Sequence, residues 1–192
     1  YIDAIIKWQK DHNNADITAE NIGYENGVLG GVVTALNTFC SRGDKVLLHS
    51  PTYVGFTGSL KNNGYDIIHS ALKQDENGVW RMDFEDMEKK IVDHKIHAAI
   101  LCSPHNPTGR VWEQRELEEA MALYQKYDVT VVSDEIWSDI VLESKHIPTQ
   151  SISEDARMRT VGMYAPSKTF NLAGLVGSYS IVYNTWLKDR ME

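Results

Sequence analysis

The sequence predicts an α/β fold, a three-layer sandwich in which helices cover both faces of a mainly parallel, mixed sheet. Short apolar segments alternate with longer amphipathic stretches, as they do when a crossover helix follows each strand. Runs such as "VTVVS" place apolar side chains on both faces of a strand, which is typical of a parallel sheet buried on both sides. Because we find no internal repeat, low-complexity tract or flexible linker, residues 1–192 are predicted to form one domain.

The chain opens on predicted helices. Within residues 1–11, apolar side chains recur at near-helical spacing, and the polar stretch "DHNNADITAEN" then interrupts the pattern. A second helix is predicted to begin just after Asn26-Gly27 and to run through "VLGGVVTALNTFC" to the turn "SRGD".

Strands and helices alternate from there. The predicted strands are 45–50, 65–70, 97–103, 129–135, 159–165 and 177–184. Helices are predicted over 83–95 and 113–127, and "NTWLKDRME" has the pattern of a helix just begun. In open α/β sheets, ligands bind at the loops after the carboxyl ends of the strands, so functional residues are expected there.

The composition is that of an ordinary globular protein, with 42% apolar and 24% charged residues. Acidic residues outnumber basic ones, 27 to 19, and no Lys/Arg cluster locally reverses the net charge of −8. This charge repels phosphate polymers and anionic lipids, so neither nucleic acid nor a membrane is expected as a partner. The apolar runs are too short to span a bilayer and the amino terminus lacks a signal-peptide pattern, so a cytoplasmic protein is predicted.

The two cysteines, Cys40 and Cys102, are predicted to be small core residues. Neither has a His or Cys neighbour at metal-ligand spacing in the sequence. We therefore expect no disulfide framework and no metal site.

The first candidate binding segments lie in the amino-terminal third. In "YENGVLGG", Asn26 and Gly27 precede a helix that begins near Val28. Free N–H groups at a helix start attract anions and glycine allows a phosphate close, although a simple Asn-Gly helix cap is the alternative. Tyr53, in "HSPTYVGF", follows a strand end and is either a stacking platform for a planar ligand or a half-buried tyrosine.

Two further candidates follow predicted strands. In "CSPHNPTGR", two prolines stiffen the backbone around Asn106, whose amide offers a donor and an acceptor; a stiff turn is the alternative. Asp134 and Glu135 end the run "VTVVSDE", and a carboxylate at the end of a buried strand needs a partner. One interpretation is an ion pair or cap with a neighbouring loop. The other is that Asp134 holds the protonated ring nitrogen of a bound cofactor.

Lys168, in "APSKTFN", is surrounded by small and apolar residues. Burial lowers the pKa of an amine, and a lysine free of its proton can attack a carbonyl to form a Schiff base. Most lysines are surface cations, but the low polarity of this segment favours a buried, reactive amine.

In chain order, an anion cradle, a stacking aromatic, an amide, a carboxylate and a lysine match the requirements of pyridoxal phosphate. With "SPHNPTGRVW", "SDEIWSD" and "APSKTFNLAGL", the sequence closely resembles the fold-type I pyridoxal-phosphate enzymes of the class I/II aminotransferase family. Within that family it resembles the cystathionine β-lyase-like (C–S lyase) branch. The resemblance covers essentially the whole chain and implies the large cofactor-binding domain of the aspartate-aminotransferase fold.

The resemblance implies a role for each candidate. Lys168 would hold the cofactor covalently and later move the substrate's Cα proton, Asp134 would pair with the ring nitrogen, and Asn106 would contact the phenolic oxygen. The other cofactor-binding positions would be Tyr53 on the ring and, around the phosphate, Asn26, Gly27, Val28 and Ser167.

Two positions depart from the pattern of many aminotransferases in the family. Three residues after Asp134, where a tyrosine often contacts the cofactor, the chain has Trp137. The resemblance implies that Trp137 is also a cofactor-binding position, although it offers only an N–H donor. Eight residues after Lys168, where an arginine often clamps the phosphate, it has Val176. The missing arginine and "APSKTFNLAGL" resemble the C–S lyase branch.

The implied function is a C–S β-lyase that acts on cystathionine or related cysteine conjugates and releases a thiol, pyruvate and ammonia. An amino acid aminotransferase is the alternative enzyme, and a folded module that is inactive or only binds partners is the alternative of another class. The chain begins without Met, so we expect a piece of a longer protein. The resemblance implies that this protein is a homodimer and that the family's amino-terminal arm and small carboxyl-terminal domain lie outside residues 1–192. A nicotinamide-binding domain is set aside because Gly-X-Gly-X-X-Gly is missing and "NGVLGG" precedes the first predicted strand.

Overall fold

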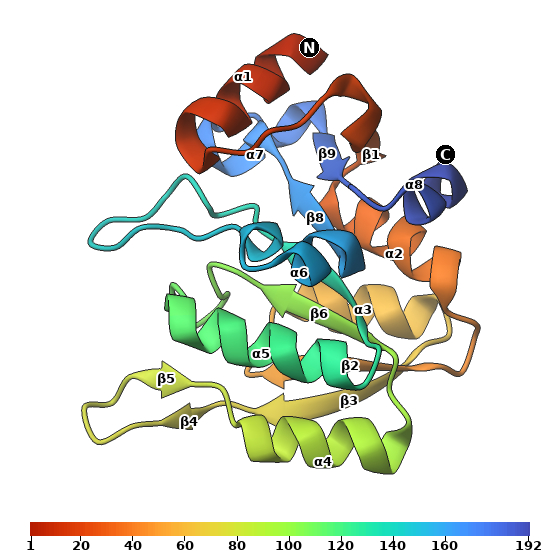
Figure 1. Ribbon diagram of the computed structural model, residues 1–192, viewed down its shortest axis with the longest axis vertical. Coiled ribbons are helices and arrows are strands. Elements are labelled where there is room, and N and C mark those ends of the chain that lie inside the picture. Colours follow the sequence, from red (N-terminus) through yellow and green to blue (C-terminus); the bar gives the residue numbers. More distant parts are fainter.

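The computed structural model describes residues 1–192 and is built around a seven-stranded mixed sheet (Figure 1). Its strands are β1 (Ile22–Asn26), β2 (Lys45–Ser50), β3 (Asp66–Ala71), β6 (Ala98–Cys102), β7 (Thr130–Asp134), β8 (Thr160–Tyr164) and β9 (Gly177–Ile181). They are ordered β1-β9-β8-β7-β6-β2-β3. The strands from β8 to β3 run parallel, whereas β9 is antiparallel to both of its neighbours. A short hairpin, β4 (Lys73–Gln74) and β5 (Trp80–Arg81), lies outside this sheet.

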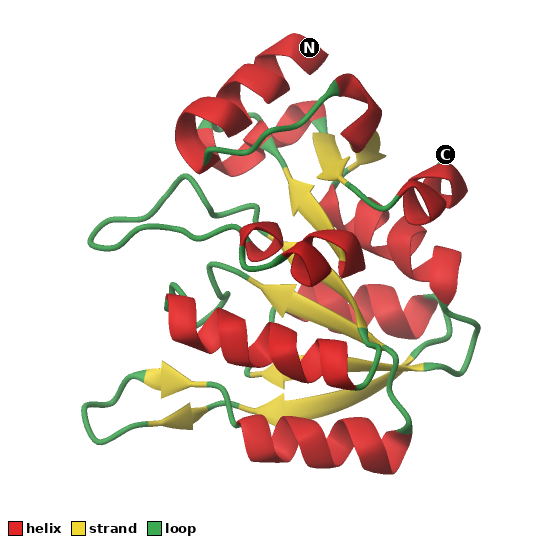
Figure 2. Cartoon of the chain, viewed as in Figure 1, coloured by secondary structure: helices red, strands yellow, loops and turns green.

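Helices cover both faces of the sheet, which confirms the predicted three-layer fold (Figures 1 and 2). One face packs against α2 (Val28–Phe39), α3 (Val54–Asn62) and α8 (Thr185–Met191). The other face packs against α4 (Phe84–His94), α5 (Gln114–Lys126) and α6 (Glu154–Arg159). Helix α1 (Ile2–Asn13) covers the β8–β9 end through a smaller cluster that includes Ile5.

Alternate residues of each parallel strand serve the two layers. On β2, Val46 and Leu48 belong to the core under α2 and α3, whereas Leu47 belongs to the core under α4 and α5. Side chains along a strand point to opposite faces in turn, so a run of apolar residues is what a strand covered on both faces requires. Polar side chains therefore emerge mainly at the strand ends.

The predicted elements are all present, and their ends differ from the expected ones by three residues at most. The sequence did not predict β1, α3, the β4–β5 hairpin or the short helices α6 and α7 (Pro166–Thr169). Strand β1, with the sequence IGYEN, has no apolar run, and only Ile22 and Glu25 of its five residues are buried. The expectation that "NGVLGG" precedes the first strand is therefore wrong, since β1 leads directly into it. The absence of Gly-X-Gly-X-X-Gly is unaffected.

No helix of the structure is both long enough and apolar enough to cross a membrane.

Candidate cofactor site

A cavity of about 290 Å³ lies where the carboxyl ends of β6, β7 and β8 meet the start of α2. This is the edge of the sheet at which open α/β folds bind ligands. All nine predicted site residues line it, namely Asn26, Gly27, Val28, Tyr53, Asn106, Asp134, Trp137, Ser167 and Lys168. The fold thus brings together side chains from segments that are far apart in the sequence.

The start of α2 presents an uncapped helix end to the cavity. Gly27 is the N-cap residue with φ of 77°, where any side chain would be strained, and no side chain caps the helix. The first N–H groups of a helix have no partner inside it, and the helix dipole adds partial positive charge there. Asn26 is exposed and its side chain accepts no hydrogen bond from the helix, so Gly27 caps the helix through its backbone alone.

Asp134 ends β7 and has only 5% of its surface exposed. Its Oδ1 accepts one hydrogen bond, from the backbone N–H of Ile136 at 3.1 Å. Burial is the main reason that the pKa of Asp134 rises to about 7. A cation or donor inside the cavity would stabilise the ionised carboxylate, because a buried charge is costly until it is paired.

Lys168 lies on α7 (Pro166–Thr169), the short helix after β8. Its Nζ is 5.5 Å from the centre of the Trp137 ring, which is within cation–π range. The expected burial of Lys168 by its own segment is wrong, because Lys168 is exposed. Phe170 and Leu175 are 50% and 72% exposed, so they turn to solvent instead of covering the amine. Apolar composition alone did not reveal the direction of these side chains.

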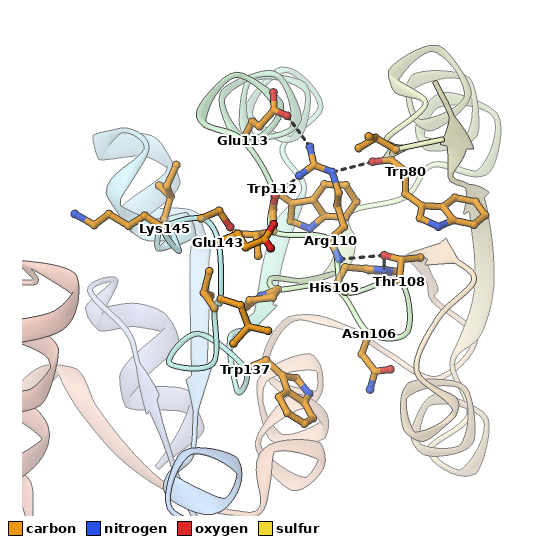
Figure 3. Close-up of a pocket in the computed structure, with 18 of the residues that line it drawn as sticks. Trp80, His105, Asn106, Thr108, Arg110, Trp112, Glu113, Trp137, Glu143 and Lys145 are labelled. Carbon is orange, nitrogen blue, oxygen red and sulfur yellow. Dashed lines mark hydrogen bonds and ion pairs between the residues drawn. The ribbon is translucent and has the colours of Figure 1, made fainter. Parts of the chain in front are cut away.

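The loop after β6 carries Asn106, whose side-chain amide has no hydrogen-bond partner within the chain. Arg110 anchors this loop by donating to the carbonyl of Trp80 and to the carboxylate of Glu113, both at 3.0 Å (Figure 3). It also donates to the carboxylate of Glu116. The loop is thereby fixed to the β4–β5 hairpin and to α5. Asn106 keeps both its donor and its acceptor free for a ligand.

A second, larger hollow of about 1080 Å³ adjoins the first. It lies between the β4–β5 hairpin, the loop 104–114 and the segment 137–147, and it shares Asn106 and Trp137 with the smaller cavity (Figure 3). The two cavities therefore lie on either side of Asn106 and Trp137.

Tyr53 is partly exposed, at 36%, and stands at the start of α3. Its ring meets Phe56 edge-on at 5.5 Å. The ring also lies against Gly55, where an added Cβ would be only 2.3 Å from Tyr53 Cε1. Gly55 thus leaves room for the ring position that faces the cavity.

A family model for aminotransferase class I and II matches residues 1–192. The chain belongs to the aminotransferase class I and II family. Within it, the chain is 39% identical over 181 residues to cystathionine beta-lyase PatB of Bacillus subtilis (strain 168), a match that covers 94% of the chain and 46% of PatB. It is 31% identical over 191 residues to Protein MalY of Escherichia coli (strain K12), covering 98% of the chain and 48% of MalY.

A solved structure of the same fold is that of cystalysin from Treponema denticola, which contains a pyridoxal 5'-phosphate cofactor. It matches the whole chain with a TM-score of 0.94 and 36% identity, and 48% of cystalysin is covered. The chain spans about half the length of these relatives.

The two positions that depart from the pattern of many family members both line the cavity of this aminotransferase-family chain. Trp137 lies within cation–π range of Lys168. Val176 adopts a left-handed φ of 55°, is half exposed, and has its Cγ1 3.8 Å from the point where a side chain on Gly27 would begin. A side chain at position 176 therefore lies beside the uncapped start of α2.

A buried hydrogen-bond network surrounds Glu135, the residue that follows Asp134. From the sequence, only an ion pair or cap was predicted for the acidic residues at this strand end. Glu135, fully buried, pairs with His146 Nε2 at 2.7 Å and accepts hydrogen bonds from Tyr164 at 2.7 Å and from Ser133 and the Thr149 N–H at 3.0 Å. Burial acts to raise the pKa of Glu135, but His146 and the donors outweigh it and hold that pKa below its usual value. The network fixes the segment that follows Asp134. The acidic pair "DE" was its only sequence signal.

Proposed function

We propose that the protein is a pyridoxal-phosphate-dependent C–S β-lyase that acts on cystathionine or related cysteine conjugates and releases a thiol, pyruvate and ammonia. The observation that carries the proposal is the meeting of Lys168, Asp134 and Asn106 with an uncapped helix start in one cavity. Two relatives support the proposal. PatB is named a cystathionine beta-lyase, and cystalysin contains bound pyridoxal phosphate.

The residues present fit the cofactor group by group. The uncapped α2 start, with Asn26, Gly27, Val28 and Ser167, would hold the phosphate, because free N–H groups and the helix dipole favour an anion. Tyr53 would stack on the ring and Asn106 would contact its phenolic oxygen through the free amide. The carboxylate of Asp134 is buried and accepts only one hydrogen bond. A protonated ring nitrogen would supply the positive partner that it lacks.

Bound pyridoxal phosphate would supply an electron sink for the charge left on the substrate's Cα. The chain's own residues would do the rest. Asp134 would keep the ring nitrogen protonated, which requires an ionised carboxylate held in a water-poor site. Lys168 would hold the cofactor through Nζ and then take the Cα proton, with its position limited by the Trp137 ring. The β-thiolate would then leave the substrate, and water would hydrolyse the released 2-aminoacrylate to pyruvate and ammonia.

An amino acid aminotransferase is the second candidate, since the family model covers that activity. In both reactions Lys168 would remove the proton from the substrate's Cα. The two would differ in whether a β-substituent then leaves the substrate or Lys168 delivers the proton to the bound cofactor. The missing arginine at Val176 and the likeness to PatB favour the lyase.

We extend the proposal to the organisation of the protein: residues 1–192 are the cofactor-binding large domain of a longer, cytoplasmic homodimer. Exposed apolar side chains beside the cavity, Phe170, Leu172, Leu175 and Val176, support a partner surface there. Sedimentation of the full-length protein tests this, and a monomer at micromolar concentration would contradict the homodimer.

The experiment that tests the cofactor site is borohydride reduction of the protein after pyridoxal phosphate has been added, followed by peptide mapping. We expect a visible absorbance band and a label on Lys168, which Lys168→Ala abolishes and Lys61→Ala, on the exposed face of α3, leaves intact. Release of pyruvate from cystathionine without an added 2-oxo acid would identify the lyase. A label elsewhere, or none, would overturn the proposed site.

A further inference from the structure

Three potential metal ligands meet at the opposite end of the sheet from the cofactor cavity. Cys40 is the C-cap residue of α2, Asp44 precedes β2, and His97 precedes β6, so the group lies at the amino ends of β2 and β6 (Figure 1). Their ligand atoms all lie within 4.8 Å of one another, and each residue is partly exposed. Because His97 is 57 positions from Cys40, spacing in the sequence could not reveal the group.

The two other residues approach the same atom of His97. Cys40 Sγ is 3.7 Å from His97 Nε2, and Asp44 Oδ2 is 3.4 Å from the same nitrogen. In a Cys-His-Asp nucleophile system the acid and the thiol would occupy opposite ring nitrogens, so this arrangement does not suit proton relay. It suits ligands that converge, since a thiolate and an imidazole on one tetrahedral zinc ion lie about 3.5 Å apart, and an imidazole and a carboxylate about 3.3 Å.

The backbone around the three residues is fixed by hydrogen bonds. Asp44 Oδ2 accepts from the Ser41 N–H at 2.7 Å, which orients the carboxylate as an outer-shell bond would. The N–H of Cys40 donates to Leu36 at 2.7 Å, and the carbonyl of His97 accepts from Thr130 at 2.9 Å. Few backbone changes are therefore needed to bring the ligand atoms onto an ion.

We propose that Cys40, Asp44 and His97 bind one zinc ion through Sγ, a carboxylate oxygen and Nε2, with water at the fourth position. The donor set selects zinc over magnesium or calcium, because thiolate and imidazole are poor ligands for those hard cations. The ion would tie the end of α2 to the starts of β2 and β6. Since α2 has 12 residues, the ion would stand about 18 Å from the helix start that lines the cofactor cavity.

The test uses metal-free protein titrated with Co²⁺, whose ligand-field bands report a tetrahedral site with a thiolate, and with Zn²⁺ in competition. We expect saturation at one ion per chain and a rise in melting temperature on addition of Zn²⁺. Cys40→Ser and His97→Ala should each weaken binding at least about 100-fold, since even outer-shell partners are worth 10- to 100-fold. His94→Ala removes a partly exposed histidine of α4 and should leave binding unchanged.

A variant that binds Co²⁺ as tightly as the parent protein after loss of Cys40 or His97 would overturn the proposal. So would the absence of a thiolate signal at saturating Co²⁺, or an equal loss of binding in His94→Ala. None of these readouts depends on the cofactor or on turnover, so the result is independent of the proposed lyase activity.

Discussion

Substitution of Asp134 by asparagine tests whether the carboxylate is a buried charge whose partner is the cofactor. The asparagine keeps the acceptor for the Ile136 N–H but cannot ionise. In the cofactor-free protein, burial raises the pKa of Asp134 from 3.8 to about 7. Between those values the folded protein holds a proton that the unfolded chain has released, so the free energy of unfolding falls as pH rises.

The size of the effect follows from that pKa. At about 1.4 kcal/mol per pH unit, the stability lost between pH 4 and pH 8 through Asp134 is ~4 kcal/mol. The Asp134→Asn variant does not lose this free energy of unfolding, because asparagine does not ionise. The stability of Asp134→Asn relative to the parent protein should therefore increase by ~4 kcal/mol between pH 4 and pH 8.

The assay is urea unfolding of both cofactor-free proteins at the two pH values, with Asp66→Asn, at an exposed position on β3, as the matched control. A difference between variant and parent that stays constant within about 1 kcal/mol across this range would refute the reasoning. Pyridoxal phosphate should then remove most of the pH dependence of the parent protein, because its ring nitrogen supplies the missing positive partner. If the dependence persists at saturating cofactor, Asp134 does not face that nitrogen.

Three further substitutions test the surroundings of the cavity. Gly55→Ala should displace the Tyr53 ring and weaken pyridoxal-phosphate binding about 2- to 10-fold in a fluorescence titration. Gly58→Ala, on the same helix but with open space around it, should leave binding unchanged, and equal effects of the two substitutions would contradict the role of the ring. Val176→Arg should strengthen binding about tenfold by placing a guanidinium beside the start of α2, and unchanged affinity would show that the position does not reach the phosphate. Glu135→Gln should lower the free energy of unfolding by ~3 kcal/mol because it leaves a buried four-partner network incomplete, and a loss below about 1 kcal/mol in urea unfolding would contradict this.

The sequence by itself determined the alternation of strands and helices and the positions of the polar residues at the strand ends. Apolar runs such as "VTVVS" are strong local signals, because a strand covered on both faces must be apolar at every position. Asn106, Asp134 and Lys168 follow such runs, so their place at one edge of the sheet could be expected from the order of the elements alone. Strand β1 was not predicted, because an edge strand that pairs antiparallel needs no run of apolar residues.

Only the tertiary structure decided which side chains meet and which face solvent. The exposure of Lys168 beside apolar residues that also face solvent, the four partners of Glu135, and the approach of His97 to Cys40 depend on contacts between segments that are distant in the chain. Local patterns report the period of a helix or strand, but they carry no information on the direction of a loop or on a neighbour brought in by another crossover. Burial, and with it the pKa of Asp134, is likewise a property of the assembled sheet and not of the residues next to it in sequence.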